Sequence, residues 1–222
     1  MKNLTLIIPA KKEKESLPSV IRELSNYDCK IKIIIEQTDE ETINSIKSFD
    51  VELIFQNQKG YGNALIEGIK AVETEYFCIF NADGSFNPSE LPNMLNLIKL
   101  DNYDFIFASR YEKNCGSEDD TVITYIGNFI FTMLGKIFFK LPITDILYTF
   151  VMGKSSKVKR LNLMKNDFGF CVELPIKAKQ NKMKLGTSQS HERKRIAGTK
   201  KVNAFKDGLK ILLFMIKLFF KR

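Results

Sequence analysis

Residues 76–88 read YFCIFNADGSFNP, a short apolar run that ends abruptly in Asn81-Ala82-Asp83-Gly84 before further polar residues and a proline. This pattern is typical of a buried strand in an α/β sheet whose carboxyl end opens into a polar loop. Ligands of open α/β sheets bind outside the carboxyl ends of the strands. Asp83 is therefore predicted to lie where chemistry would occur.

A carboxylate at this position has two interpretations. It can hold a divalent cation, and the cation can in turn hold a diphosphate. Alternatively, residues 81–84 form only a turn, because Asn, Asp and Gly are the usual turn residues. The choice depends on what the rest of the chain places around Asp83.

The other segments alternate between strand and helix patterns. Apolar runs predict strands at residues 4–10, 30–35, 51–55, 76–80 and 105–108. Helical spacing and helix-start signals predict helices at residues 16–24, 40–48, 61–72 and 88–100. Such regular alternation favours right-handed βαβ crossovers and a mostly parallel central sheet flanked by helices. The predicted fold class is α/β.

Length and cysteine content agree with one intracellular domain. The chain has 222 residues, enough for an α/β domain with a full core. Its four cysteines include no Cys-x-x-Cys pair and it has one histidine, so we expect reduced thiols and no zinc site. The amino terminus lacks the pattern of a signal peptide. No apolar run approaches the roughly 20 residues that span a bilayer.

The net charge of +8 is distributed unevenly along the chain. Residues 1–153 carry 15 lysines and arginines against 22 acidic residues, a net charge of −7. Residues 154–222 carry 19 against 4, a net charge of +15. A basic carboxyl-terminal third suggests a partner with phosphates, such as anionic lipid or a phosphorylated substrate. Nucleic acid is not expected, because no RNA-recognition signature accompanies the charge.

Two further segments predict helices with a wide apolar surface. Residues 125–140 carry polar side chains four positions apart on one face, namely Asn128, Thr132, Lys136 and Lys140. Residues 204–222 repeat this plan with lysines in one arc. Such helices suit a membrane interface, and packing on the domain or a homodimer contact is the alternative. We expect a domain at residues 1–203, which includes the first helix, and a separate carboxyl-terminal helix at 204–222.

A polar loop is predicted at residues 112–121, after the strand at 105–108. Loops of this length near strand ends are typically functional segments. We therefore expect this loop to be mobile and functional.

Seven short motifs follow one another along the chain. They are Ile7-Ile8-Pro9-Ala10 with Glu13, Lys59-Gly60-Tyr61-Gly62-Asn63-Ala64, Asn81-Ala82-Asp83, Ala108-Ser109-Arg110-Tyr111, Ile143-Thr144-Asp145, Phe168-Gly169-Phe170 with Glu173, and Arg193 to Lys201. Each is weak alone, whereas seven in order are strong. Over essentially its whole length, the chain resembles the family 2 glycosyltransferases with the GT-A nucleotide-diphospho-sugar fold. It looks closest to the dolichyl-phosphate-mannose-synthase-like, polyprenyl-phosphate branch.

The resemblance implies a donor site at the amino-terminal half of the sheet. The residues expected to bind the nucleotide sugar are Pro9, Ala10, Glu13, Glu36, Gly60, Asn63, Asn81, Ala82 and Asp83. Asp83 corresponds to the acid that holds Mg²⁺ or Mn²⁺ on the donor diphosphate, and Ser85 to a variable ligand beside the metal. Asn81 replaces the first acid of the family motif, which brings no charge and should weaken metal affinity.

The resemblance also implies an acceptor side. Arg110 is expected to contact a phosphate of the acceptor or donor, and planar bidentate donation suits that task. Asp145 is the first candidate for general base or acceptor orienter, and Glu173 is a lesser one. Four cations resemble the family's loop that closes over diphosphate and acceptor, namely Arg193, Arg195, Lys200 and Lys201.

Together these expectations describe a metal-dependent, inverting, hexosyltransferase-like enzyme. It would move a sugar from a nucleotide-diphosphate donor to a polyprenyl phosphate or a cell-surface glycan, on the cytoplasmic face of the membrane. One alternative is a soluble polysaccharide-building transferase with a dimerising carboxyl-terminal helix. Another is a catalytically weakened nucleotide-sugar-binding protein, motivated by Asn81, Glu36-Gln37 and Val151 where the family has other residues.

Overall fold

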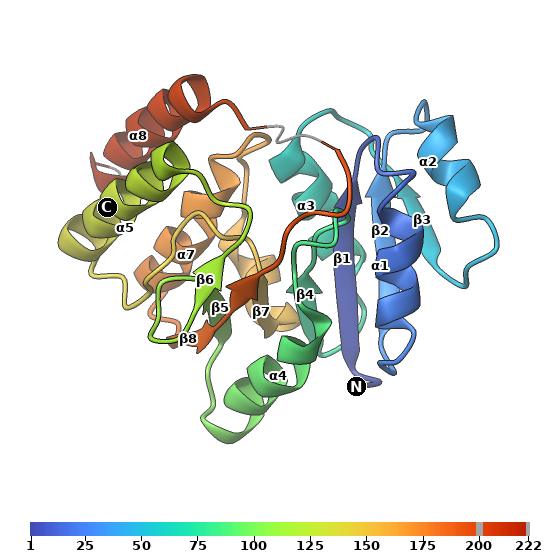
Figure 1. The fold of residues 1–222 in the computed structure, drawn as a ribbon. Helices are drawn as coiled ribbons and strands as arrows, with labels where there is room; N and C mark the ends of the chain where they lie inside the picture. Colours follow the sequence, from blue (N-terminus) through green and yellow to red (C-terminus); the bar gives the residue numbers. More distant parts are fainter. Residues whose placement is uncertain (199–201, 221–222) are drawn as a thin grey trace.

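The structure, a computed structural model, describes residues 1–198 and 202–220 (Figure 1). Lys200 and Lys201, both predicted to bind phosphate, lie outside the described residues. A seven-stranded sheet forms the centre of the molecule, with helices on both faces. The sheet has the strand order β3-β2-β1-β4-β7-β5-β8.

The elements alternate along the first half of the chain as predicted. The sheet strands are β1 (Leu4–Ala10), β2 (Lys30–Ile35), β3 (Glu52–Phe55), β4 (Tyr76–Ile79), β5 (Phe105–Ser109), β7 (Val151–Lys154) and β8 (Leu185–Gln189). A two-stranded sheet consists of β6 (Gly116–Ser117) and β9 (His191–Glu192). The helices are α1 (Leu17–Leu24), α2 (Glu40–Ser45), α3 (Tyr61–Ala71), α4 (Leu91–Leu100), α5 (Val122–Phe139), α6 (Ser155–Val158), α7 (Phe170–Gln180) and α8 (Ala204–Phe220), with short 3₁₀ turns at Pro88–Glu90 and Lys159–Leu161.

Six of the seven strands run in one direction. β1 pairs in parallel with β2 and β4, β2 pairs in parallel with β3, and β8 is parallel to β5. Only β7 is reversed, and it is antiparallel to both of its neighbours, β4 and β5. The carboxyl ends of β1, β4 and β5 therefore meet at one edge, and the α/β fold with a mostly parallel sheet is confirmed.

Alternation along the strands divides the core into two layers. Ile7 and Ile79 point to the face covered by α3, α5, α7 and α8. Leu6, Ile8 and Cys78 point to the opposite face, which α1 and α4 cover. β1 and β4 have no exposed residue on either face. Both strands are therefore nearly continuous apolar runs, which made them recognisable in the sequence.

α5 begins three residues earlier than predicted, and part of its polar face is turned toward the domain. Thr121 and Thr124 form a capping box that starts the helix at Val122. Asn128 and Thr132 are buried against the domain, while most apolar side chains of α5 point outward. Figure 1 shows α8 lying alongside α5.

α5 also corrects the expectation that no segment is apolar enough to cross a bilayer. Its 18 residues have a mean hydropathy of 1.6, and 22% of them are buried inside the protein. By length and composition alone this helix is sufficient to span a membrane. Of the polar residues that interrupt the run, the domain buries Asn128 and Thr132, whereas Lys136 is exposed.

Gly60 and Gly62 lie where the start of α3 passes the loop at 165–167. A Cβ at Gly60 would lie 2.1 Å from the Asn166 carbonyl oxygen, and one at Gly62 would lie 2.1 Å from that of Lys165. Gly60 also has a φ of +122°, which favours glycine. The two glycines therefore allow the start of α3 to pack closely against the loop at 165–167.

Gly62→Ala should lower the free energy of unfolding by about 3 kcal/mol, because backbone atoms on both sides must move. Gly127→Ala is the control, since a Cβ there meets nothing within 4 Å. That change should raise stability by about 0.5–1 kcal/mol through helix propensity. Urea denaturation measures both, and equal stability of the two variants would contradict the close packing.

Candidate active site

Asp83 lies in a tight loop directly after β4. Its Oδ1 accepts hydrogen bonds from the Ser85 amide at 3.0 Å and the Ser85 hydroxyl at 2.7 Å. The Asn81 side-chain amide lies 3.4 Å from the same hydroxyl. Phe86 anchors the loop by packing against Phe80 and Phe150. The loop thus brings together the Asp83 carboxylate, the Ser85 hydroxyl and the Asn81 side-chain amide at the carboxyl edge of the sheet.

The segment after β9 runs along this loop. The Arg193 amide donates to the Ser85 carbonyl and the Ile196 amide to the Asp83 carbonyl, both at 2.8 Å. The Ile196 side chain covers Gly84, whose φ of +82° lets the chain turn beneath it. The cation-rich segment predicted to close over the donor is therefore already seated on the Asp83 loop.

Arg193 and Arg195 have different partners. The Arg193 guanidinium binds Glu23 of α1 and the Phe86 carbonyl, which fastens the segment to the domain. Arg195 bonds in a bidentate manner to Asp119, at 3.1 and 2.7 Å. Its Nη1 lies 3.6 Å from Asp83 Oδ2. The hydrogen bonds to Asp119, with the charge of Asp83, raise the pKa of Arg195 above its usual value.

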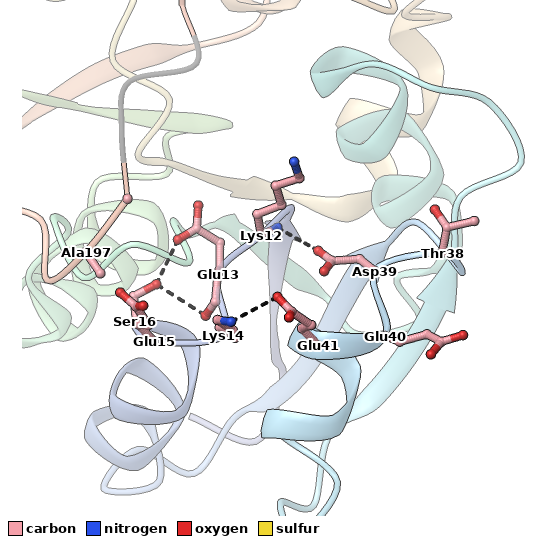
Figure 2. A pocket seen from close by; sticks show the side chains of 11 residues that line it. Lys12, Glu13, Lys14, Glu15, Ser16, Thr38, Asp39, Glu40, Glu41 and Ala197 are labelled. Atoms are coloured by element: carbon pink, nitrogen blue, oxygen red, sulfur yellow. Dashed lines mark hydrogen bonds and ion pairs between the residues drawn. The ribbon is translucent and has the colours of Figure 1, made fainter.

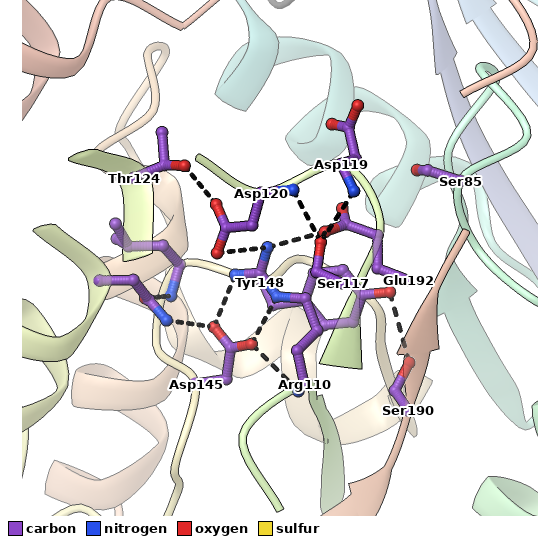
Figure 3. A network of polar contacts seen from close by, with 12 residues as sticks. Ser85, Arg110, Ser117, Asp119, Asp120, Thr124, Asp145, Tyr148, Ser190 and Glu192 are labelled. Atoms are coloured by element: carbon purple, nitrogen blue, oxygen red, sulfur yellow. Dashed lines mark hydrogen bonds and ion pairs between the residues drawn. The ribbon is translucent and has the colours of Figure 1, made fainter. Parts of the chain in front are cut away.

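Arg110 is the centre of a second, more deeply buried network (Figure 3). Its Nε and Nη2 donate to the two oxygens of Asp145 at 2.7 and 3.0 Å, and its Nη1 donates to Glu192 at 2.9 Å. The guanidinium lies 4.5 Å from the ring centroid of Tyr148. Burial opposes the positive charge, but the charge and hydrogen bonds of Asp145 prevail and raise the pKa of Arg110 well above its usual value.

Asp145 is fully enclosed in this network. Its side chain has no exposed surface and accepts from the Arg110 amide, the Arg110 guanidinium and the Asn128 side chain. Four donors satisfy a carboxylate and leave no lone pair directed at an outside substrate. Of the two predicted roles, this geometry favours the orienter over the general base.

α5 supplies further polar contacts that the sequence did not assign to the site. Asn128 donates to Asp145 at 2.6 Å and accepts from the Leu147 amide at 3.0 Å. The Thr132 hydroxyl accepts from the Ile146 amide at 3.2 Å. The inner face of α5 therefore holds the loop that orients Arg110. The four-residue spacing of polar side chains was the available signal for this contact.

Three acidic residues of the site were also missed. Asp119 pairs with Arg195, Asp120 lies 3.8 Å from Arg110, and Glu192 accepts from Arg110 and the Ser117 hydroxyl. Two of these lie in the loop at 112–121, which was predicted to be functional as a whole. Their partners are more than 70 positions away in the sequence or, for Asp120, a buried arginine. No local sequence pattern predicts such pairings.

The predicted nucleoside side contains a pocket of about 580 Å³ (Figure 2). It is lined by residues 12–16, 38–41 and 197–198 beyond the carboxyl ends of β1 and β2, where Pro9 and Ala10 end β1. Glu13 contributes to the wall and accepts from the Ser16 hydroxyl at 2.7 Å. Glu36 does not line this pocket and pairs with Lys11 at 2.7 Å.

Glu173 and Asn63 have local structural partners. The Glu173 carboxylate is buried in α7, accepts from the amides of Met164 and Lys165, and pairs with Lys177. The Asn63 side chain donates to the Gln58 carbonyl and to Glu67. Both residues stabilise the loops around them, and neither contacts the Asp83 or Arg110 networks in the hydrogen bonds of the described residues.

The described residues contain no group of three or more His, Cys, Asp or Glu side chains that could hold a metal ion. Mg²⁺ and similar hard cations in transferases need only one or two carboxylates, because substrate phosphates and water complete the shell. The oxygens of Asp83 and its neighbours fit this type of site. A cationic guanidinium already lies beside Asp83, so the position suits positive charge.

A family model, Glycosyl transferase family 2, matches residues 5–161, which include β1, the Asp83 loop and Asp145. The chain belongs to this family. The matched residues include most of the central sheet, the Asp83 loop, Arg110 and Asp145. They end before β8 and the segment after it, which carries Glu192 and Arg195.

Two relatives are similar over most of their length. An uncharacterized glycosyltransferase of Mycobacterium tuberculosis (strain ATCC 25618 / H37Rv) is 22% identical over 176 residues, which cover 79% of this chain and 78% of the relative. UDP-N-acetylglucosamine–dolichyl-phosphate N-acetylglucosaminyltransferase of Methanococcus voltae is 24% identical over 213 residues, which cover 83% of both chains.

Solved structures share the fold of this family 2 glycosyltransferase. Glucosyl-3-phosphoglycerate synthase from Mycobacterium tuberculosis, in complex with Mn²⁺, UDP and glucosyl-3-phosphoglycerate, superimposes with a TM-score of 0.76 at 11% identity. The match covers 97% of this chain and 79% of that one. Mannosyl-3-phosphoglycerate synthase from Rubrobacter xylanophilus gives a TM-score of 0.72 at 11% identity, with 96% and 72% covered.

Asp145→Asn should lower the free energy of unfolding by about 3 kcal/mol, because it leaves the buried Arg110 without its main countercharge. Urea denaturation at neutral pH measures this change. Glu41→Gln is the control, since Glu41 pairs with Lys14 at the surface with 75% of its side chain exposed, and little change is expected. Equal stability of the two variants would show that Arg110 does not depend on Asp145.

Proposed function

We propose that this protein is a metal-dependent, inverting glycosyltransferase that transfers a sugar from a nucleotide-diphosphate donor to a polyprenyl phosphate at the cytoplasmic face of a membrane. The observation that carries the proposal is the orientation of α5. Its polar side chains reach the Asp145–Arg110 network, and its apolar side chains point outward. A lipid surface against α5 would thus bring a lipid-linked acceptor next to the site.

On the donor side, Asp83 would hold Mg²⁺ or Mn²⁺, with the Ser85 hydroxyl beside its carboxylate and the Asn81 side-chain nitrogen next to that hydroxyl. When bound, the metal would offset the charge of the departing nucleoside diphosphate. The pocket beside Glu13 has the position expected for the nucleoside, at the ends of β1 and β2. Support comes from the solved glucosyl-3-phosphoglycerate synthase with the same fold, which holds Mn²⁺ and UDP.

On the acceptor side, the site offers no exposed general base among its described carboxylates that faces Arg110. Asp145 is enclosed, and Glu192 and Asp120 face the Arg110 guanidinium. An acceptor hydroxyl would need a base, whereas a phosphate monoester is already ionised at neutral pH and supplies its own nucleophilic oxygen. The structure therefore favours a phosphate acceptor over a glycan hydroxyl. The name of the Methanococcus voltae relative, which specifies dolichyl phosphate, supports the same choice.

The membrane surface of the proposal is formed by α5 and α8. Apolar side chains at least one-third exposed lie on both helices: Val122, Ile123, Tyr125, Ile126, Phe129, Ile130, Met133, Ile137 and Phe138 on α5, and Phe205, Leu209, Leu212, Leu213, Ile216 and Phe220 on α8. Exposed lysines accompany them, namely Lys136, Lys140, Lys206, Lys210 and Lys217. An apolar surface this large flanked by cations suits an anionic bilayer.

α8 is not an independent appendage to this surface. Ile211, Met215 and Leu218 are buried in the same core layer as α3 and α7, and Phe219 packs edge-on against Phe138. The two helices therefore present one continuous surface. Dimerisation through this surface is the competing use, and it would give a soluble enzyme instead of a peripheral one.

Asp83→Ala should reduce metal-dependent sugar transfer by about 10²- to 10³-fold, because the donor diphosphate loses the charge that Asp83 would place beside it. The assay follows nucleoside diphosphate release from a panel of nucleotide sugars with Mn²⁺ and a short polyprenyl phosphate. Asp101→Ala is the control, because Asp101 lies at the end of α4 on the opposite edge of the sheet. If wild-type protein binds a donor but never turns it over, the weakened binding protein is the correct interpretation.

Replacing Phe129 and Leu213 together by Ser should weaken binding to vesicles that contain phosphatidylglycerol by about 100-fold, since two half-exposed apolar side chains no longer insert. Vesicle flotation measures the bound fraction. Leu100→Ser, which removes a side chain that is 82% exposed at the end of α4, should not change it. Wild-type protein that dimerises in ultracentrifugation and ignores the vesicles would favour the soluble alternative.

A further inference from the structure

Asp83 and Asp119 face the same cation although they belong to distant parts of the chain. Arg195 lies between them, with Nη2 2.7 Å from Asp119 Oδ2 and Nη1 3.6 Å from Asp83 Oδ2. The side chains of Asp83 and Asp119 are 14% and 13% exposed. Two carboxylates from distant segments thus share the guanidinium of Arg195.

The position of Asp119 is fixed by its own loop. The amides of Asp119 and Asp120 donate to the Ser117 hydroxyl at 3.2 and 2.9 Å. The Glu118 amide donates to the Glu192 carbonyl at 2.9 Å, next to the β6–β9 pairing. The backbone at Asp119 is therefore held by bonds that do not involve Arg195. Without the guanidinium that they share, the negative charges of Asp83 and Asp119 would favour the binding of another cation.

A second acid at this point would add to the single carboxylate of the Asp83 loop. Asn81 stands where the family motif has an acid, so the Asp83 loop alone supplies one charge to a metal. Mg²⁺ and Mn²⁺ sites on phosphate substrates commonly use one or two carboxylates. Asp119 is the described carboxylate that shares a cation with Asp83.

We propose that Asp119 is a second carboxylate ligand of the metal that Asp83 holds, and that Arg195 occupies this cation position until metal and donor bind. The inference rests on the proposed metal-dependent function and adds a ligand from the loop at 112–121. Exchange of a guanidinium for a divalent cation leaves Arg195 available to the diphosphate, a few ångströms from where it began. The loss of the acid at position 81 is thereby compensated from a different part of the fold.

The test measures Mn²⁺ binding to the full chain, with Mn²⁺ alone as the probe, by electron paramagnetic resonance of the free ion. Arg195→Gln should tighten Mn²⁺ binding severalfold, because it removes the competing cation. Asp119→Asn should weaken binding about tenfold, because one anionic ligand is lost. Glu118→Gln is the matched control: it removes the same charge one position away, from a side chain that pairs with His191 and is 56% exposed, and should leave binding unchanged.

A double variant separates ligation from an effect through Arg195. In the Arg195→Gln background, Asp119→Asn should still weaken Mn²⁺ binding about tenfold. No change in that background, or a change equal to that of Glu118→Gln, would overturn the role of Asp119. Thermal unfolding of each variant without Mn²⁺ verifies that it is folded.

Asp83→Asn in the same Arg195→Gln background distinguishes this inference from the proposed function. If Asp83→Asn abolishes Mn²⁺ binding and Asp119→Asn does not alter it, only the second ligand is wrong. If neither change affects Mn²⁺ binding, the metal site of the proposed function is wrong as well.

Discussion

The buried Arg110 guanidinium is the group on which the carboxyl edge of the sheet depends. Its side chain is only 10% exposed, and a charge in that position is costly unless it is paired and fully hydrogen-bonded. The partners come from three places, namely the loop at Asp145, Glu192 in β9 and Asp120 at the start of α5. One cation therefore fixes the relative positions of segments that no strand pairing of the main sheet connects.

This constraint accounts for the unusual orientation of α5. The Asp145 loop needs donors and acceptors for its carboxylate and amides, and Asn128 and Thr132 supply them from the inner face of the helix. A helix whose polar side chains are used inward has mainly apolar side chains left for its outer face. In water this arrangement exposes a large apolar area, which is costly, whereas against a lipid surface the same area is stabilising. The same orientation of α5 thus positions the Asp145 loop and exposes the apolar surface.

The fold was predictable from sequence where the signal was local, and the site only in part. Apolar runs and turn residues identified β1 to β5 and the Asp83 loop, because burial and turn geometry act over a few residues. β7 escaped prediction, since Val151–Lys154 is a four-residue strand whose reversed direction depends on its neighbours β4 and β5. Likewise, the sequence could list Arg195 as a cation but could not pair it with Asp119, 76 positions away. Glu173 shows the reverse error, a suggestive residue whose buried carboxylate serves its own loop.

The three described arginines near the site are each paired with carboxylates, so the charge of each guanidinium is already balanced within the protein. Arg193 binds Glu23, Arg195 binds Asp119 and Asp83, and Arg110 binds Asp145 and Glu192. A donor diphosphate that binds one of these arginines would compete with the carboxylate that already pairs with the guanidinium. Exchange is less costly at Arg195 than at Arg110, because the Arg195 side chain is 20% exposed and that of Arg110 is 10% exposed. Arg110 is enclosed and stacked on Tyr148, and these contacts hold its guanidinium in place. The site thus combines a buried cation, Arg110, with a more exposed one, Arg195, which we propose exchanges with the metal.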